Sequence, residues 1–327
     1  MSSNLDELIT RADLDGLIRL IDATCAHRDW PHLHEISNAC RAAVHSGRQL
    51  WPAATLADYR LALQAPAAWA TKVLRSEASR FSLGPLTEVI AQNHSWHELV
   101  DHLPHEPQST FVAYECALRG QIITEADALF PALEIPIQCA QWEPTYQLAQ
   151  YTENEATFPS PPLPDTSIAQ RFATTAGRQC DEQKISQAAH QLVEAWTTQS
   201  NGRCETVSSS GDALCALGAL GIRSANLRHI TSDVAMAWMA WAGSSGGAHG
   251  RRRGAATGRF SAWWMLAALD RSLESWPIST LQAGEIAARW TWLWWDANEP
   301  ETGWQLQLAG HNAQTNQSWA ISARDAQ

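Results

Sequence analysis

The residues best suited to chemistry lie at 243–260, in the stretch GSSGGAHGRRRGAATGRF. Glycine recurs there every four residues around three consecutive arginines. Glycine lets a loop turn its backbone N–H groups inward, and guanidinium groups bind phosphate or carboxylate through paired hydrogen bonds. The stretch therefore predicts an anion-binding loop with these ligand-binding residues: Arg251, Arg252, Arg253, Arg259, Gly247, Gly250, Gly254 and Gly258.

Three other interpretations of this stretch stay open. Glycines spaced by four would line one side of a helix and let a second backbone approach closely. The arginines could instead pair with carboxylates in an ordinary surface loop, or the loop could dock another protein. A nucleotide loop is excluded, because no lysine precedes a serine or threonine after the last glycine, and a helix is expected before the stretch.

Candidate catalytic groups near the loop are few. Asp233 and His249 are the acid–base candidates, and they could converge with Arg228 and His229 if their elements are neighbours. Arginines with one imidazole and one carboxylate would suit a phosphate-containing substrate. No motif of a known catalytic class accompanies them.

Histidine, cysteine and tryptophan offer weaker candidates. His94 and His97 could share a helix face, but no HExxH motif surrounds them, so we expect no metal and no cofactor. Seven scattered cysteines without a CxxC pair predict buried free thiols. Most of the 17 tryptophans lie in apolar segments and should pack the core, whereas Trp304 and Trp319 could stack on a ligand.

Charge narrows the class of partner. The net charge is −11, yet residues 223–259 hold six arginines and one carboxylate. This predicts a phosphate-bearing small molecule or an acidic protein as partner, because nucleic acid needs a wider positive surface. No apolar run approaches the roughly 20 residues of a membrane span, and the acidic N-terminus lacks a secretory pattern, so we expect a cytoplasmic protein without a membrane partner.

The elements that position these residues fall into three regions. Residues 1–130 read as short amphipathic helices, stacked as solenoid-like hairpins of the HEAT or TPR kind. Residues 131–168 form an acidic, proline-rich connector. Residues 169–327 form a tryptophan-rich α+β domain with the loop at 243–260 and a three-stranded meander at 289–323. The predicted fold class is mainly α with a small C-terminal antiparallel sheet.

Two blocks carry a resemblance: FSLGPLTEVIAQNHSWHELVDHLPHEP at 81–107 and GGAHGRRRGAATGRFSAWWMLAALD at 246–270. They resemble an uncharacterised family of conserved actinobacterial helical proteins. The resemblance implies a bacterial cytosolic protein and supplies no activity.

The sequence thus predicts a binding or scaffold module whose Gly/Arg-rich loop holds a phosphate-bearing ligand or an acidic partner. The alternative is an enzyme that acts on a phosphorylated or sugar-like small molecule through the C-terminal domain.

Overall fold

The chain folds into two compact units. The computed structural model describes residues 2–75, 82–124, 130, 132–164, 170–175, 177–180, 182–298 and 303–326. The N-terminal unit comprises Met1–Ala132 and Ala149–Phe158, and the C-terminal unit comprises Leu133–Leu148 and Pro159–Gln327. The predicted connector is therefore divided between the units, and its residues 131 and 165–168 lie outside the described residues. Its action as a spacer stays a prediction.

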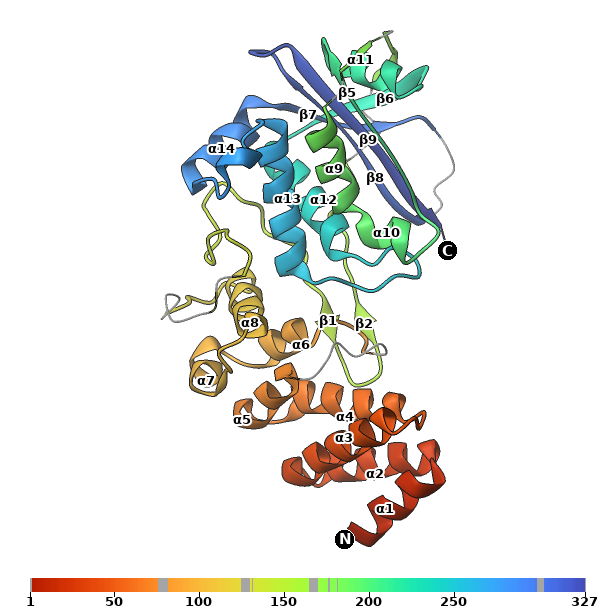
Figure 1. Cartoon of the computed structure of the whole chain (residues 1–327). Helices are drawn as coiled ribbons and strands as arrows, with labels where there is room; N and C mark the ends of the chain where they lie inside the picture. The colour runs from red at the N-terminus through yellow and green to blue at the C-terminus, as the bar shows by residue number, and fades with distance from the viewer. Residues whose placement is uncertain are drawn as a thin grey trace. The chain divides into compact units, whose positions relative to one another are not determined.

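The N-terminal unit is built from helices joined by short turns (Figure 1). Asp13, Asp29 and Ser95 cap helices by accepting hydrogen bonds from backbone N–H groups. Leu17 and Ile21, four residues apart on one helix face, are fully buried, as an amphipathic helix requires. The elements are α1 (Ser2–Arg11), α2 (Leu14–Ala26), α3 (Trp30–His45), α4 (Trp51–Gln64), α5 (Ala67–Ala70), η1 (Thr71–Arg75), α6 (Leu86–Asn93), α7 (Trp96–Leu99), η2 (Val100–His102), α8 (Pro107–Leu118), β1 (Gln150–Tyr151) and β2 (Ala156–Thr157). The solenoid-like stacking is not confirmed.

The C-terminal unit is a seven-stranded antiparallel sheet with helices packed on it. Its strands are β3 (Gln170–Ala173), β4 (Arg178–Cys180), β5 (Arg203–Ser210), β6 (Ser224–Ile230), β7 (Thr291–Asp296), β8 (Gly303–Asn312) and β9 (Gln317–Ala326). Its helices are α9 (Gln183–Leu192), α10 (Glu194–Thr198), α11 (Ala213–Ala219), α12 (Ser232–Ser244), α13 (Ala255–Leu269), η5 (Leu273–Ser275) and α14 (Thr280–Arg289).

The predicted fold class, helices with a C-terminal antiparallel sheet, is confirmed, but the sheet is larger than expected. The strand order is β3-β6-β7-β8-β9-β5-β4, so the predicted meander forms its centre as β7-β8-β9. Residues 299–302 of the meander lie outside the described residues. Residues 170–173 form β3, which lies outside the predicted meander.

Side-chain alternation divides the sheet into two faces. On one face, Trp304 of β8 reaches α12, where its ring stacks on Trp241 with centroids 5.0 Å apart. On the other face, a buried cluster packs against α11, and it includes Val207, Leu227, Leu293, Trp295, Ala309 and Ala320. Helices therefore cover both faces, and among the described helices α11 is the one that packs against the buried cluster of the second face (Figure 1).

The sheet curls around α11. Strands β3 and β4 lie at opposite edges, yet only residues 174–177 join them. Seven flat strands would place these edges about 29 Å apart, whereas the connection spans at most about 18 Å. The α11 face is consequently concave.

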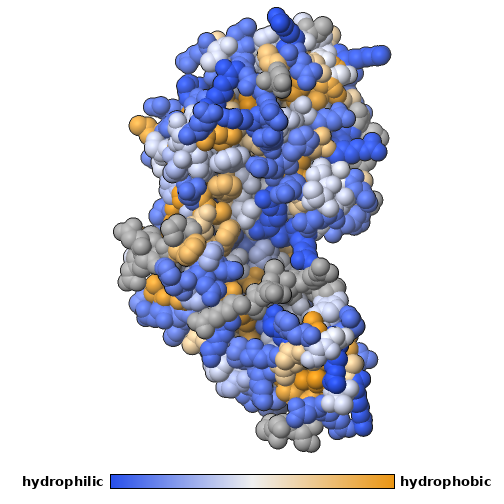
Figure 2. All heavy atoms as spheres, viewed as in Figure 1, coloured by the Kyte–Doolittle hydropathy of each residue, from blue (hydrophilic) through white to orange (hydrophobic). Residues whose placement is uncertain are grey.

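Hydrophilic side chains cover most of the surface that Figure 2 shows, with small apolar areas between them. Within the described ranges, no helix is both long and apolar enough to cross a bilayer.

Candidate functional site in the C-terminal unit

The Gly/Arg stretch is shorter as a loop than the sequence suggests. Helix α12 runs through Ser244 and α13 starts at Ala255, so only residues 245–254 lie between helices. A Cβ on Gly258 would lie 2.1 Å from the carbonyl oxygen of Ala240, and one on Gly243 would lie 3.2 Å from the Cα of Gly258. These two glycines therefore allow a close crossing of α12 and α13, whereas Gly246, Gly250 and Gly254 lie in the loop and do not line one side of a helix.

Most backbone N–H groups of the loop donate to acceptors within the protein. Ala248 N donates to Oδ2 of Asp325 at 2.6 Å, and Arg251 N donates to Oε1 of Gln199 at 3.1 Å. Arg253 N and Gly254 N both donate to the Ser244 carbonyl. These amides are already occupied, so they do not form the inward-facing anion cradle that the glycines led us to expect.

Arg259 is not a surface group. Its side chain is fully buried, and its Nε and Nη2 donate to the two carboxylate oxygens of Glu143 at 2.6 and 2.7 Å. Its remaining N–H groups donate to the carbonyls of Pro136, Ile137 and Gln138. The guanidinium therefore makes its hydrogen bonds inside the core of the C-terminal unit. Arg259 is not available to bind a ligand, so this part of the predicted ligand-binding set is wrong.

The three consecutive arginines have separate surroundings. Arg251 is exposed. Arg252 lies near Ser244, with Nη1 3.5 Å from its hydroxyl. Arg253 donates to the carbonyl of Gln191 at 2.9 Å and lies 3.7 Å from the carboxylate of Glu194. Their convergence on one anion, with Gly247, Gly250 and Gly254 beside them, stays a prediction.

Two predicted catalytic residues lie at opposite ends of α12. Asp233 is in the first turn of this helix, and His249 is in the loop that follows its last turn. Eleven residues separate Asp233 from Ser244, which is about 17 Å of helix. The convergence of Asp233 on the loop is therefore wrong, because α12 holds the two apart.

The two candidate stacking tryptophans also differ. Trp319 is fully buried, and its Nε1 donates to the hydroxyl of Thr206 at 2.9 Å. It is therefore a core residue. Trp304 is half-buried against Trp241.

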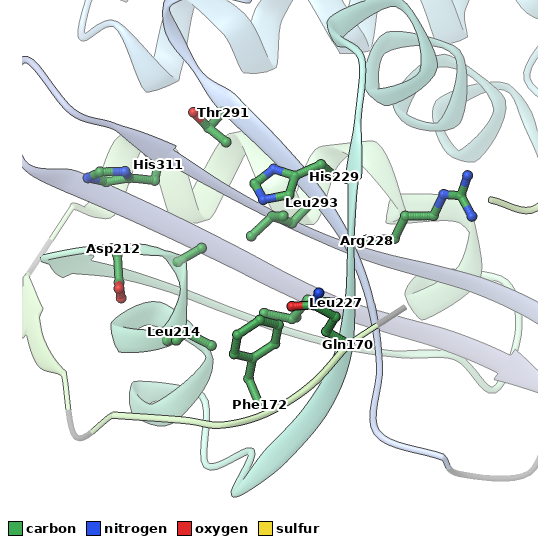
Figure 3. A pocket seen from close by; sticks show the side chains of 11 residues that line it. Gln170, Phe172, Asp212, Leu214, Leu227, Arg228, His229, Thr291, Leu293 and His311 are labelled. Carbon is green, nitrogen blue, oxygen red and sulfur yellow. The ribbon is translucent and has the colours of Figure 1, made fainter. Parts of the chain in front are cut away.

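A pocket of about 480 Å³ lies on the concave face of the sheet, beside the start of α11 (Figure 3). Small-molecule sites commonly have a volume of about 300–1,000 Å³. The apolar lining comes from β3, β6, β7 and α11: Phe172, Leu227, Leu293, Ala213 and Leu214. The polar lining is Gln170, Asp212, Arg228, His229, Thr291 and His311.

Strand register explains how these side chains share one surface. Gln170 pairs with Leu227, His229 pairs with Leu293, and Thr291 pairs with His311, so the paired side chains point to the same face. His229 and His311 lie two strands apart and two residues out of register, which places their backbones about 12 Å apart. Arg228, one residue out of this alternation, extends away from the other labelled side chains in Figure 3.

The polar groups of the pocket can bind a ligand without being arranged as a catalytic set. Asp212 Oδ1 accepts a hydrogen bond from Cys215 N at 3.1 Å and so caps α11. Among the described side chains, no hydrogen bond joins Asp212, His229 and His311 to one another. The imidazoles and the Thr291 hydroxyl can each donate to or accept from a polar ligand group.

Sequence reasoning missed this pocket, although one signal was present. The β6 segment SANLRHI alternates, so that Ala225, Leu227 and His229 share a face. Two apolar residues followed at the same spacing by a histidine indicate a strand that is buried at its start and exposed at its end. The other pocket residues Leu293, Thr291 and His311 join this face only because β7 and β8 pair beside β6, and the sequence of β6 does not show this pairing.

The cysteines are free thiols, as predicted, although only Cys40 and Cys116 are fully buried. Burial raises the pKa of the Cys40 thiol to about 11 and that of Cys116 to about 12. Burial also raises the pKa of Cys204 to about 12. These three thiols are therefore protonated and poorly nucleophilic at neutral pH.

Comparison with protein families matches residues 15–327 to a family described as a family of unknown function (DUF6183). No curated protein and no solved structure matches the chain. The match spans parts of both units and carries no activity with it.

Proposed function

Because the chain belongs to the DUF6183 family, whose function is unknown, we propose a function from its own residues. The C-terminal unit is a binding module, placed in the cytoplasm, that holds the apolar part of a ligand in the sheet pocket. The observation that carries this proposal is the pocket itself. Its floor is formed by the apolar side chains Leu227, Leu293 and Phe172, and several polar side chains surround this floor.

The floor supplies the affinity and the polar side chains supply the orientation. Each ligand CH₂ group buried on Leu227, Leu293 or Phe172 contributes about 0.8 kcal/mol. His229 and Thr291 then fix the polar end of the ligand by hydrogen bonds. Phe172 is 37% exposed, so the apolar surface is accessible from solvent.

Anilinonaphthalene sulfonate, a fluorescent probe with an aromatic body and one negative charge, tests the proposal. We expect one saturable site in a fluorescence titration of the folded chain. Phe172→Ala removes part of the floor and should weaken probe binding about tenfold.

The matched control is Leu281→Ala, which truncates an apolar side chain that is 73% exposed on α14 and absent from the pocket lining. It should leave the probe affinity unchanged. Equal affinities for wild type, Phe172→Ala and Leu281→Ala would show that the probe binds elsewhere and would end the proposal.

The loop supports a second candidate function, binding of an acidic partner or a phosphate-bearing ligand through Arg251–Arg253. The specific observation is that Arg251 is exposed on a loop held to Gln199 and Asp325. A thermal-shift titration with inorganic phosphate tests the small-ligand form: stabilisation should disappear in Arg251→Ala. Unchanged stabilisation in this variant would remove the loop as the phosphate site.

Catalysis on a phosphorylated or sugar-like molecule is the less supported alternative. Asp233 and His249 lie too far apart to act on one reacting group, as α12 separates them.

A further inference from the structure

Strand β3 is an edge strand of the sheet. It pairs with β6 from Gln170↔Leu227 to Ala173↔Ser224 and is the last strand on its side of the order. All four of its residues are exposed. In the described part of the chain no other strand pairs with it, so about half of its backbone N–H and C=O groups face outward and can accept another strand.

The edge and the pocket are continuous. Gln170 and Phe172 belong to β3 and also line the pocket, together with Leu227 of the neighbouring strand. A strand added to β3 would turn every second side chain toward the pocket face. In strand addition, backbone hydrogen bonds give affinity, and pockets for alternate side chains give specificity.

The two strands at this edge carry positive charge, and Asp212, the carboxylate of the pocket lining, lies at the start of α11. Residues 170–175 and 223–230 contain Arg171, Arg223 and Arg228 and no carboxylate. Arg171 and Arg223 are both exposed, and Arg171 donates to the hydroxyl of Ser224 at 2.7 Å. An incoming strand with acidic side chains would therefore be attracted here, in a chain whose net charge of −11 repels acidic segments elsewhere.

We propose that β3 is the docking edge for an extended, acidic segment of a partner protein, one of whose apolar side chains enters the sheet pocket. This inference rests on the proposed function, because it names the class of ligand that the pocket holds. It accounts together for the exposed edge, the half-exposed Phe172 and the positive charge.

The test uses a capped, fluorescein-labelled octapeptide of alternating glutamate and leucine, added to the full chain. We expect saturable binding by anisotropy and displacement of anilinonaphthalene sulfonate. Methylation of alternate backbone amides removes the ladder donors and should weaken the peptide about tenfold or more.

Two protein variants separate this edge from the rest of the surface. Arg171→Glu should weaken the peptide about fivefold and leave the affinity for the small probe unchanged. Arg178 is also exposed but lies on β4 at the opposite edge of the sheet, so Arg178→Glu should change neither affinity.

The outcomes distinguish the two proposals. If the small probe binds the pocket and the peptide does not bind, strand docking is overturned and the pocket function stands. If the peptide binds equally well when methylated, or equally well to Arg171→Glu, it docks elsewhere and the inference fails. If Phe172→Ala leaves binding of the small probe intact, the pocket function fails first.

Discussion

At the scale of single residues, the most consequential group is Glu143. Besides Arg259, its carboxylate accepts hydrogen bonds from the hydroxyl of Tyr146 at 2.6 Å and from Nε1 of Trp263 at 3.1 Å. Burial acts to raise the pKa of Glu143, but the hydrogen bonds and charge of Arg259 outweigh it and hold that pKa below its usual 4.5. The carboxylate is therefore ionised inside the core.

Replacing Glu143 by Gln tests this arrangement. The change keeps the volume but leaves the Arg259 charge buried without a counter-ion, so we expect the C-terminal unit to lose about 3–5 kcal/mol of stability. Urea unfolding followed by tryptophan fluorescence measures the loss. Glu194→Gln, which removes an exposed acid near Arg253, should cost at most about 1 kcal/mol. Equal losses for both variants would contradict the assigned role.

One partly buried histidine, His94, predicts a pH dependence of the stability of the N-terminal unit. Burial lowers the pKa of His94 below its usual 6.5, and its Nε2 is buried without a hydrogen-bond partner within the described residues. The unfolded chain thus binds the proton more tightly, so the unit should lose stability as pH falls below about 6.5. His94→Gln should flatten this part of a stability–pH curve, whereas exposed His45→Gln should not. A slope unchanged in His94→Gln would refute the assignment.

Arg259 also shows why this site could not be fully predicted. The sequence analysis grouped it with Arg251, Arg252 and Arg253, because all four lie in one glycine-rich stretch. Its partner Glu143 is 116 residues away. A local sequence pattern cannot reveal a pair of residues this far apart. Arg259 is buried and Arg251 is exposed because α13 packs on the core, and this packing cannot be read from the stretch itself.

At the scale of elements, the crossing of α12 and α13 depends on two glycines that allow backbones to touch. Gly258→Ala places a methyl group against the carbonyl of Ala240, so we expect a loss of at least about 2 kcal/mol, measured as a lower unfolding midpoint.

The comparison variant is Gly221→Ala, where φ is +87° and open space surrounds the added Cβ. This change strains the backbone alone and should cost about 1 kcal/mol. A Gly258→Ala variant as stable as Gly221→Ala would show that the helices can separate without penalty.

The sequence predicted some strands well and others not at all. Strand β8 alternates tryptophan and leucine with glutamine, and in β7 and β9 large apolar residues recur at every second position, a period that is typical of strands. Strand β5, RCETVSSS, has one aliphatic residue, Val207, among serines, and β3 and β4 have only four and three residues. Their pairing partners, rather than their own composition, decide their conformation.

At the scale of the whole molecule, the C-terminal unit includes a segment that precedes the β1–β2 hairpin. Leu133–Leu148 belongs to this unit, and Pro136, Ile137, Gln138 and Glu143 from this segment surround the Arg259 guanidinium. A domain boundary placed at residue 168 would cut these contacts.

Two fragments test this division. A fragment of residues 133–327 retains the acceptors of Arg259 and should give a cooperative melting transition by circular dichroism. A fragment of residues 159–327 leaves the guanidinium without its counter-ion and should fail to melt cooperatively. Identical transitions from both fragments would show that the segment is dispensable.

The place of β9 in the strand order has a consequence for biosynthesis. This strand lies between β8 and β5, and it pairs with β5 along Arg203↔Arg324 to Ser210↔Gln317. During translation, the edge of β5 that pairs with β9 therefore stays without a partner while more than a hundred further residues are added. Because β5 has no neighbour on that side until residue 326 clears the ribosome, the nascent C-terminal unit is exposed to aggregation for most of its synthesis.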